Sequence, residues 1–137
     1  MGVLQRLRSL FRFRRSAGPA ETAPVPEHPV WAALCQAMDQ EELWKEPGLS
    51  MSALCRHLSS NKTTVNLLYR QHGSSFSEDL ARRRIAYVMA ELERDAGRHL
   101  EDVFFDAGYQ TYSTGWRQFR RTTGVSPTEY IQRLSRK

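Results

Sequence analysis

The sequence predicts an all-α protein, and three observations support this fold class. From residue 29 onward, apolar side chains recur at intervals of three and four residues, which is the spacing of one helix face. Residues that cap helices, chiefly Ser, Asn and Gly, stand between these apolar stretches. No run of alternating β-branched residues indicates a strand.

The N-terminal part differs from the rest in composition. Residues 1–15 contain five arginines and no acidic residue, and residues 16–29 contain four prolines. The apolar residues of the first stretch share one helical face: Val3, Leu7, Leu10 and Phe11. We expect residues 1–28 to be a disordered basic tail with an extended Pro-rich linker, and residues 29–137 to fold. Three interpretations of the tail stay open: binding to an anionic membrane surface, nonspecific phosphate contacts, or the vestige of a longer upstream region.

Charge and composition narrow the class of protein. The net charge is +5, but residues 16–137 hold 15 basic and 15 acidic side chains, so the excess belongs to the tail. With 40% hydrophobic and 26% charged residues, the chain is typical of a soluble globular protein. No stretch reaches the ~20 apolar residues of a membrane span. Cys35 and Cys55 lack the spacing of metal ligands, and we expect buried thiols in a reducing cytoplasm.

The first helices are predicted from apolar stripes and caps. The stripe of the first helix consists of Val30, Leu34, Ala37 and Met38. The expected helices, with the residues that begin or end them, are 30–44 before Pro47-Gly48, 51–58 behind Ser50, and 62 to about 72 between Asn61 and Gly73.

A long helix follows, from about 76 to 95. Ser75 and Glu78 form a capping box at its start. Its apolar face consists of Ala81, Ile85, Val88 and Leu92. The helices expected after Gly97 are about 100–107, about 111–122 beyond the Gly108 turn, and 127–135 behind a second capping box of Ser126 and Glu129.

One pattern occurs twice, about 50 residues apart. Each copy has an aromatic residue, a basic residue, a glycine, a capping box and the next helix. The copies are Tyr69-Arg70, Gly73, Ser75 and Glu78, and then Phe119-Arg120, Gly124, Ser126 and Glu129. A short helix and a tight turn precede each copy, which is the plan of a helix-turn-helix unit. The units are expected at about 50–72 and about 99–122.

These residues resemble the AraC/XylS family of bacterial transcription regulators over residues 49–131. The second unit carries the sharper motif: Gly108-Tyr109, Arg117, Phe119-Arg120 and the stretch Gly124-Val125-Ser126-Pro127-Thr128-Glu129-Tyr130. The first unit matches at Leu54, Leu58, Asn61, Val65, Tyr69, Gly73, Phe76 and Glu78. The resemblance implies two homeodomain-like helix-turn-helix subdomains joined by a long linker helix.

The family also implies an interface with double-stranded DNA. Base-facing positions would be Lys62, Thr63, Asn66 and Leu67 in the first recognition helix, and Tyr112, Ser113, Trp116 and Arg117 in the second. Arg117 suits guanine and Asn66 suits adenine, because both side chains form bidentate contacts. Phosphate contacts would come from Arg70, Arg120 and Arg121. An alternative for Tyr112 and Trp116 is packing into the core.

Three positions depart from the family pattern. Phe104 replaces a small residue, and Gly115 replaces a bulky apolar one within the second recognition helix. We predict that the Phe104 ring fills the space left at Gly115. Leu67 stands where an arginine often contacts DNA, so the first unit is expected to read fewer bases.

The favoured function is therefore a cytoplasmic, sequence-specific transcription regulator that inserts two recognition helices into successive major-groove segments. The alternative is a degenerate helical domain that acts as a protein-interaction or membrane-surface module. No catalytic set, metal spacing or cofactor motif is evident, so we expect neither an enzyme nor a cofactor. Further partners that the resemblance implies are RNA polymerase and a sensor or dimerisation partner.

Overall fold

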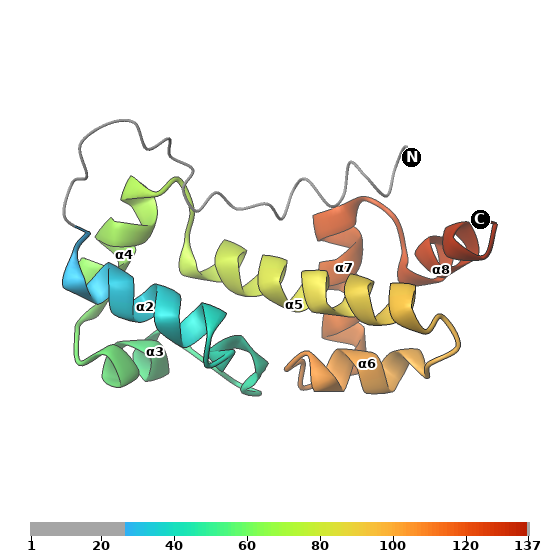
Figure 1. Cartoon of the computed structure of the whole chain (residues 1–137), viewed down its shortest axis with the longest axis horizontal. Helices are drawn as coiled ribbons and strands as arrows, with labels where there is room; N and C mark the ends of the chain where they lie inside the picture. Colours follow the sequence, from blue (N-terminus) through green and yellow to red (C-terminus); the bar gives the residue numbers. More distant parts are fainter. Residues whose placement is uncertain (1–26, 137) are drawn as a thin grey trace.

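The computed structural model describes residues 27–136, which form seven α-helices, one short 3-10 helix and no strand. The all-α fold class is thereby confirmed. In chain order the helices are α2 (Pro29–Asp39), η1 (Leu43–Lys45), α3 (Met51–Leu58), α4 (Lys62–Gln71), α5 (Phe76–Arg94), α6 (Leu100–Asp106), α7 (Tyr112–Thr123) and α8 (Pro127–Ser135). Two groups of helices, α2–α4 and α6–α8, lie at the two ends of α5 (Figure 1). The expectations for the tail and linker fall outside the described residues, except at Glu27 and His28.

The first group consists of α2 and the helix-turn-helix unit α3–α4. The predicted caps are confirmed: Ser50 Oγ accepts from the Ala53 N–H at 3.1 Å, and Asn61 Oδ1 accepts from the Thr64 N–H at 2.9 Å. One core joins this group, and its buried residues are Trp31, Leu34, Ala37, Met38, Trp44, Leu54, Cys55, Leu58, Val65, Leu68 and Tyr69.

The prediction of one helix over 30–44 is wrong at its C-terminal end. The helix stops at Asp39, because Glu42 has a left-handed backbone conformation with φ 52° and the chain turns there. The short helix η1 then brings Trp44 into the first core, where it is 7% exposed. Burying this large ring offers a physical reason for the break in the helix.

Helix α5 packs against both groups of helices. It begins at Ser75, whose Oγ accepts from the Glu78 N–H at 3.1 Å, which is the first half of the predicted capping box. Phe76 and Leu80 pack against the first core. The second core contains four α5 residues and most of the inner face of α6–α8: Ile85, Val88, Met89, Leu92, Val103, Phe104, Ala107, Tyr109, Phe119 and Tyr130.

Residues 27–136 were also searched for a membrane-spanning helix, a metal site and disulfide bonds. No helix there is long and apolar enough to cross a membrane. No three His, Cys, Asp or Glu side chains there are placed to hold a metal ion. Cys35 and Cys55 are free thiols; Cys55 is buried as expected, whereas Cys35 is only half-buried. Partial burial, reinforced by the nearby Asp39 carboxylate, raises the pKa of Cys35 to about 11.

Candidate nucleic-acid interface

Both helix-turn-helix units turn in the same way. In the first, Ser59 adopts φ 53° and the Ser60 N–H donates to the Cys55 carbonyl at 2.9 Å. In the second, Gly108 adopts φ 106° and the Tyr109 N–H donates to the Phe104 carbonyl at 3.1 Å. This bond from the sixth residue back to the first closes a tight helix end. The second helix of each unit, α4 or α7, therefore begins directly after the turn.

Helix α4 presents one polar face to solvent. Val65, Leu68 and Tyr69 are buried, and they hold the inner face of the helix in the first core. The residues predicted to contact bases or phosphate on this helix are all exposed: Lys62, Thr63, Asn66, Leu67 and Arg70. Leu67 is one of two large hydrophobic side chains that stay exposed within residues 27–136, at 47%.

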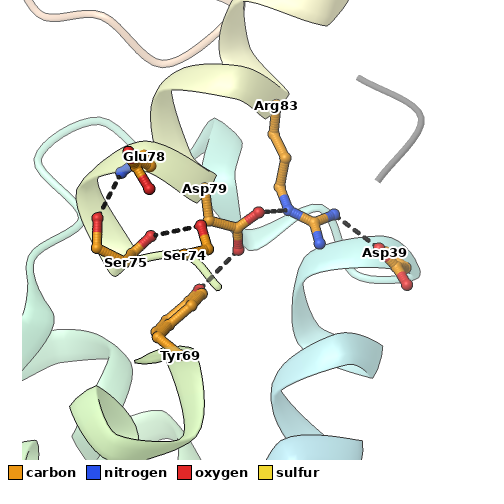
Figure 2. Close-up of polar contacts among 7 residues, drawn as sticks. All are labelled: Asp39, Tyr69, Ser74, Ser75, Glu78, Asp79 and Arg83. Carbon is orange, nitrogen blue, oxygen red and sulfur yellow. Dashed lines mark hydrogen bonds and ion pairs between the residues drawn. The ribbon is translucent and has the colours of Figure 1, made fainter. Parts of the chain in front are cut away.

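A polar network centred on the buried Asp79 holds the inner face of α4 (Figure 2). The Tyr69 hydroxyl donates to Asp79 Oδ2 at 2.6 Å, and Arg83 Nε donates to Asp79 Oδ1 at 2.8 Å. Arg83 also donates to Asp39 at 2.7 Å, so the network joins α4, α5 and α2. Burial and the Asp79 carboxylate raise the pKa of Tyr69, which therefore stays a neutral donor.

Helix α7 differs from α4 in that two half-buried aromatic residues, Tyr112 and Trp116, follow one another on one side of the helix. Ser113, Arg117, Arg120 and Arg121 are exposed, as a DNA-facing surface requires. Tyr112 is half-buried and meets the Phe104 ring edge-to-face at 5.8 Å. This places the Tyr112 ring against the second core, in line with the packing alternative. Trp116 is also half-buried, but it is not among the residues of either core.

Phe104 and Gly115 fit together as predicted. Gly115 is buried in the middle of α7, and a Cβ built on it would lie 2.5 Å from Phe104 Cδ1 and 2.8 Å from Cγ. Real Cβ atoms essentially never approach another atom this closely. The ring, which is fully buried, therefore occupies the volume that a larger side chain at position 115 would need.

Charge is segregated within the described residues. Helices α4 and α7 carry five of the 14 Lys and Arg side chains of residues 27–136 and none of the 14 Asp and Glu. No ion pair or hydrogen bond within that range engages the five, which are Lys62, Arg70, Arg117, Arg120 and Arg121. Lys45, Arg83, Arg94, Arg98 and Arg133, in contrast, all pair with carboxylates. Five of the exposed cations without such a partner thus lie on the two candidate recognition helices, where no acid accompanies them.

The supporting residues behind these helices were missed at the sequence level. Asp79 is 2% exposed and Arg84 is 8% exposed, although both read as surface charges on an amphipathic helix. One signal was available for Asp79. The repeat pairs Tyr69 with Phe119, and the additional hydroxyl of a buried tyrosine requires a hydrogen-bond partner.

Comparison with known proteins agrees with this architecture. Residues 54–133, more than half of the chain, match the sequence model of the helix-turn-helix domain family. A search of curated protein sequences found no match. Two similar solved structures are a protein of unknown function from Listeria innocua and a DNA-binding transcriptional dual regulator from Escherichia coli K-12.

Both structures share the fold at low identity. The Listeria protein is 24% identical with a TM-score of 0.64, and the alignment covers 80% of this chain and 97% of that one. The Escherichia coli protein is 18% identical with a TM-score of 0.66, and the alignment covers 85% of this chain and 100% of that one. The family match, the doubled unit and the shared fold lead to one conclusion: the chain belongs to the AraC-type helix-turn-helix family, the DNA-binding domains of transcription regulators.

Proposed function

We propose that the chain is a sequence-specific regulator of transcription that inserts α4 and α7 into successive major-groove segments of duplex DNA. The segregation of charge carries this proposal. The folded part is neutral overall, yet the two helices have five unpartnered cations and no acid. DNA affinity depends on cations that reach phosphates and base edges, so this local surface matters more than net charge.

The exposed side chains suggest a different role for each unit. On α7, Arg117 is the base-reading residue, through a bidentate contact to guanine, and Ser113 and Trp116 flank it. On α4, Asn66 reads adenine, and Lys62 and Thr63 lie at the start of the same helix. Arg70, Arg120 and Arg121 follow near the helix ends and bind phosphates, which sets the register of the protein on DNA.

Leu67 gives the first unit a preference for thymine. Its side chain is 47% exposed on the outer face of α4, beside Asn66 and one turn after Thr63. An aliphatic side chain in the major groove packs against the C5 methyl group, which only thymine has. The first half-site is therefore expected to be rich in A·T pairs, and the second to contain a guanine.

The competing function, a protein-interaction or membrane-surface module, drew its support from the zero net charge of residues 16–137. Such a module has no need to keep two solvent-facing helices free of acids while all 14 acids of residues 27–136 lie elsewhere. The observed segregation of charge thus favours DNA binding over this alternative.

The test measures the affinity of the full chain for a duplex over a range of salt concentrations. The five tail arginines are replaced by Gln, so that binding reports the folded part: Arg6, Arg8, Arg12, Arg14 and Arg15. A DNA-binding domain loses affinity steeply as salt rises, and Arg120→Ala lowers the logarithmic slope by about 0.9. Arg133→Ala is the matched control, because Arg133 pairs with Glu129 on α8. Absence of binding at low salt would refute the proposed function.

A further inference from the structure

Arg84 is a buried cation that the proposed DNA contacts do not use. It lies in the middle of α5 and is 8% exposed. Its Nε donates to the Trp44 carbonyl at 2.8 Å, and Nη2 donates to the Glu46 carbonyl at 3.0 Å. Its bonds within residues 27–136 thus go to backbone carbonyls and not to a carboxylate, and burial lowers its pKa. Burying a guanidinium without a carboxylate partner costs free energy of desolvation. We therefore looked for a role of its two hydrogen bonds in the structure.

The two units meet at this side chain. The guanidinium carbon lies 5.3 Å from the centre of the Tyr109 ring, which belongs to the turn of the second unit. A Cβ on Gly108 would lie 2.8 Å from the Trp44 carbonyl oxygen and 2.9 Å from Arg84 Nε. We call this contact the joint; it consists of Trp44, Glu46, Arg84, Gly108 and Tyr109.

The joint lies next to both helix-turn-helix units. Glu46 is four residues before Ser50, the N-cap of α3. Tyr109 is two residues before Thr111, the N-cap of α7. Helix α5 connects the two cores along a single axis, and an elongated connection of this kind resists twisting less well than one with a second point of contact. Segment 43–48 and turn 108–110 form that second contact, where Gly108 packs on the Trp44 backbone, and Arg84 contacts both segments at once.

We propose that Arg84 is a positioning residue whose joint fixes the phase and separation of α4 and α7, so that the protein accepts two half-sites at one spacing only. This inference rests on the proposed function for its consequence at DNA, but the joint itself is testable without DNA. A rigid pair of units tolerates one spacing, and a pair with a loosened joint tolerates several.

The DNA-free test uses residual dipolar couplings of the full chain in a dilute alignment medium. In the wild type, amides of α3–α4 and of α7–α8 are expected to fit one alignment tensor. In Arg84→Met the two units are expected to give tensors of different magnitude, because they reorient independently. Arg94→Met is the matched control, since Arg94 lies on the same helix, is 66% exposed and pairs with Glu91. A single tensor in a folded Arg84→Met protein would overturn the proposal.

The DNA test varies the separation of two half-sites in steps of one base pair. The wild type should lose affinity sharply away from the best spacing. In Arg84→Met that penalty should fall by about tenfold, which is the effect of one charged hydrogen bond on an equilibrium constant, while single half-site binding stays unchanged. An unaltered spacing profile would overturn the proposal.

A second variant distinguishes a loss of positioning from a loss of folding. Arg84→Lys keeps the charge and the aliphatic stem but loses the planar pair of donors, so it should relax the spacing partly. If Arg84→Lys and Arg84→Met both lose their dispersed amide spectra, Arg84 is a folding determinant and the positioning role is wrong. If the wild type binds no DNA, the proposed function fails, and the dipolar couplings still decide whether the joint is rigid.

Discussion

The contact between Phe104 and Gly115 allows a quantitative prediction, because the size of each side chain limits the size of the other. Truncating the fully buried ring in Phe104→Ala removes packing from the centre of the second core. Substitutions of this kind cost about 3–5 kcal/mol in the free energy of unfolding. The loss should be large because the cavity faces a glycine, which offers no side chain to fill it.

Gly115→Ala should have different effects in the two backgrounds. Alanine favours a helix over glycine by about 1 kcal/mol. In the wild type the new Cβ would lie 2.5 Å from Phe104 Cδ1, and forcing atoms into a packed core costs about 1–3 kcal/mol. The substitution should therefore destabilise the wild type or leave it neutral. In the Phe104→Ala background the clash is gone, and the same substitution should stabilise the protein by about 1 kcal/mol.

The assay is equilibrium unfolding in urea, followed by circular dichroism, on the four proteins of the double-mutant cycle. The expected coupling between the two sites is about 1–3 kcal/mol, the size of the steric penalty that disappears. Gly97→Ala is the control, because its Cβ would meet only Asp95 Oδ1 at 3.4 Å. Effects of Phe104→Ala and Gly115→Ala that add to within about 0.5 kcal/mol would refute the reasoning.

Three further predictions concern single side chains. Replacing a contacted thymine by uracil removes one methyl group, whose burial contributes about 0.8 kcal/mol, so wild-type binding should weaken about fourfold. Binding by Leu67→Ala should not change, and equal losses for both proteins in a binding titration would contradict this role for Leu67. Tyr69→Phe leaves the buried Asp79 carboxylate without one donor and should lower the free energy of unfolding by about 1.5–3 kcal/mol, whereas Tyr112→Phe should change it little; similar values for both variants would disprove the importance of the network. Because the pKa of Cys35 rises from 9.0 to about 11, its alkylation at pH 8 should be about 100-fold slower than that of an ordinary thiol. Followed by mass spectrometry, the alkylation rate should increase up to pH 11, and a rate that already levels off near pH 9 would count against the raised pKa.

Much of this fold could be predicted from the sequence because its signals are local. Ser50, Asn61 and Ser75 cap their helices as predicted, since a cap depends on neighbours three residues away. The Phe104–Gly115 contact was also predictable, because both residues depart from one family pattern within one unit. The exposed positions on α4 and α7 were expected from the family resemblance, which places them on the outer face of each recognition helix.

The features that were missed depend on distant parts of the chain. Arg84 reads as a surface charge on an amphipathic helix, and only the carbonyls of Trp44 and Glu46, about 40 residues away in sequence, make it a buried one. The left-handed conformation of Glu42, which ends the first helix early, occurs at a residue that neither Gly nor Asn marks. For Tyr112, the position in the motif left both DNA contact and core packing open, and the structure adds the ring contact with Phe104.

In the proposed function, α4 and α7 both read DNA. Selection of bound sequences from a random duplex pool by the full chain tests it most directly, with the tail arginines replaced by Gln to suppress nonspecific retention. The expected result is two enriched half-sites with centres about 10 base pairs apart, one rich in A·T and one with a guanine whose enrichment Arg117→Ala abolishes. A single enriched half-site, or a pool without enrichment, would contradict it.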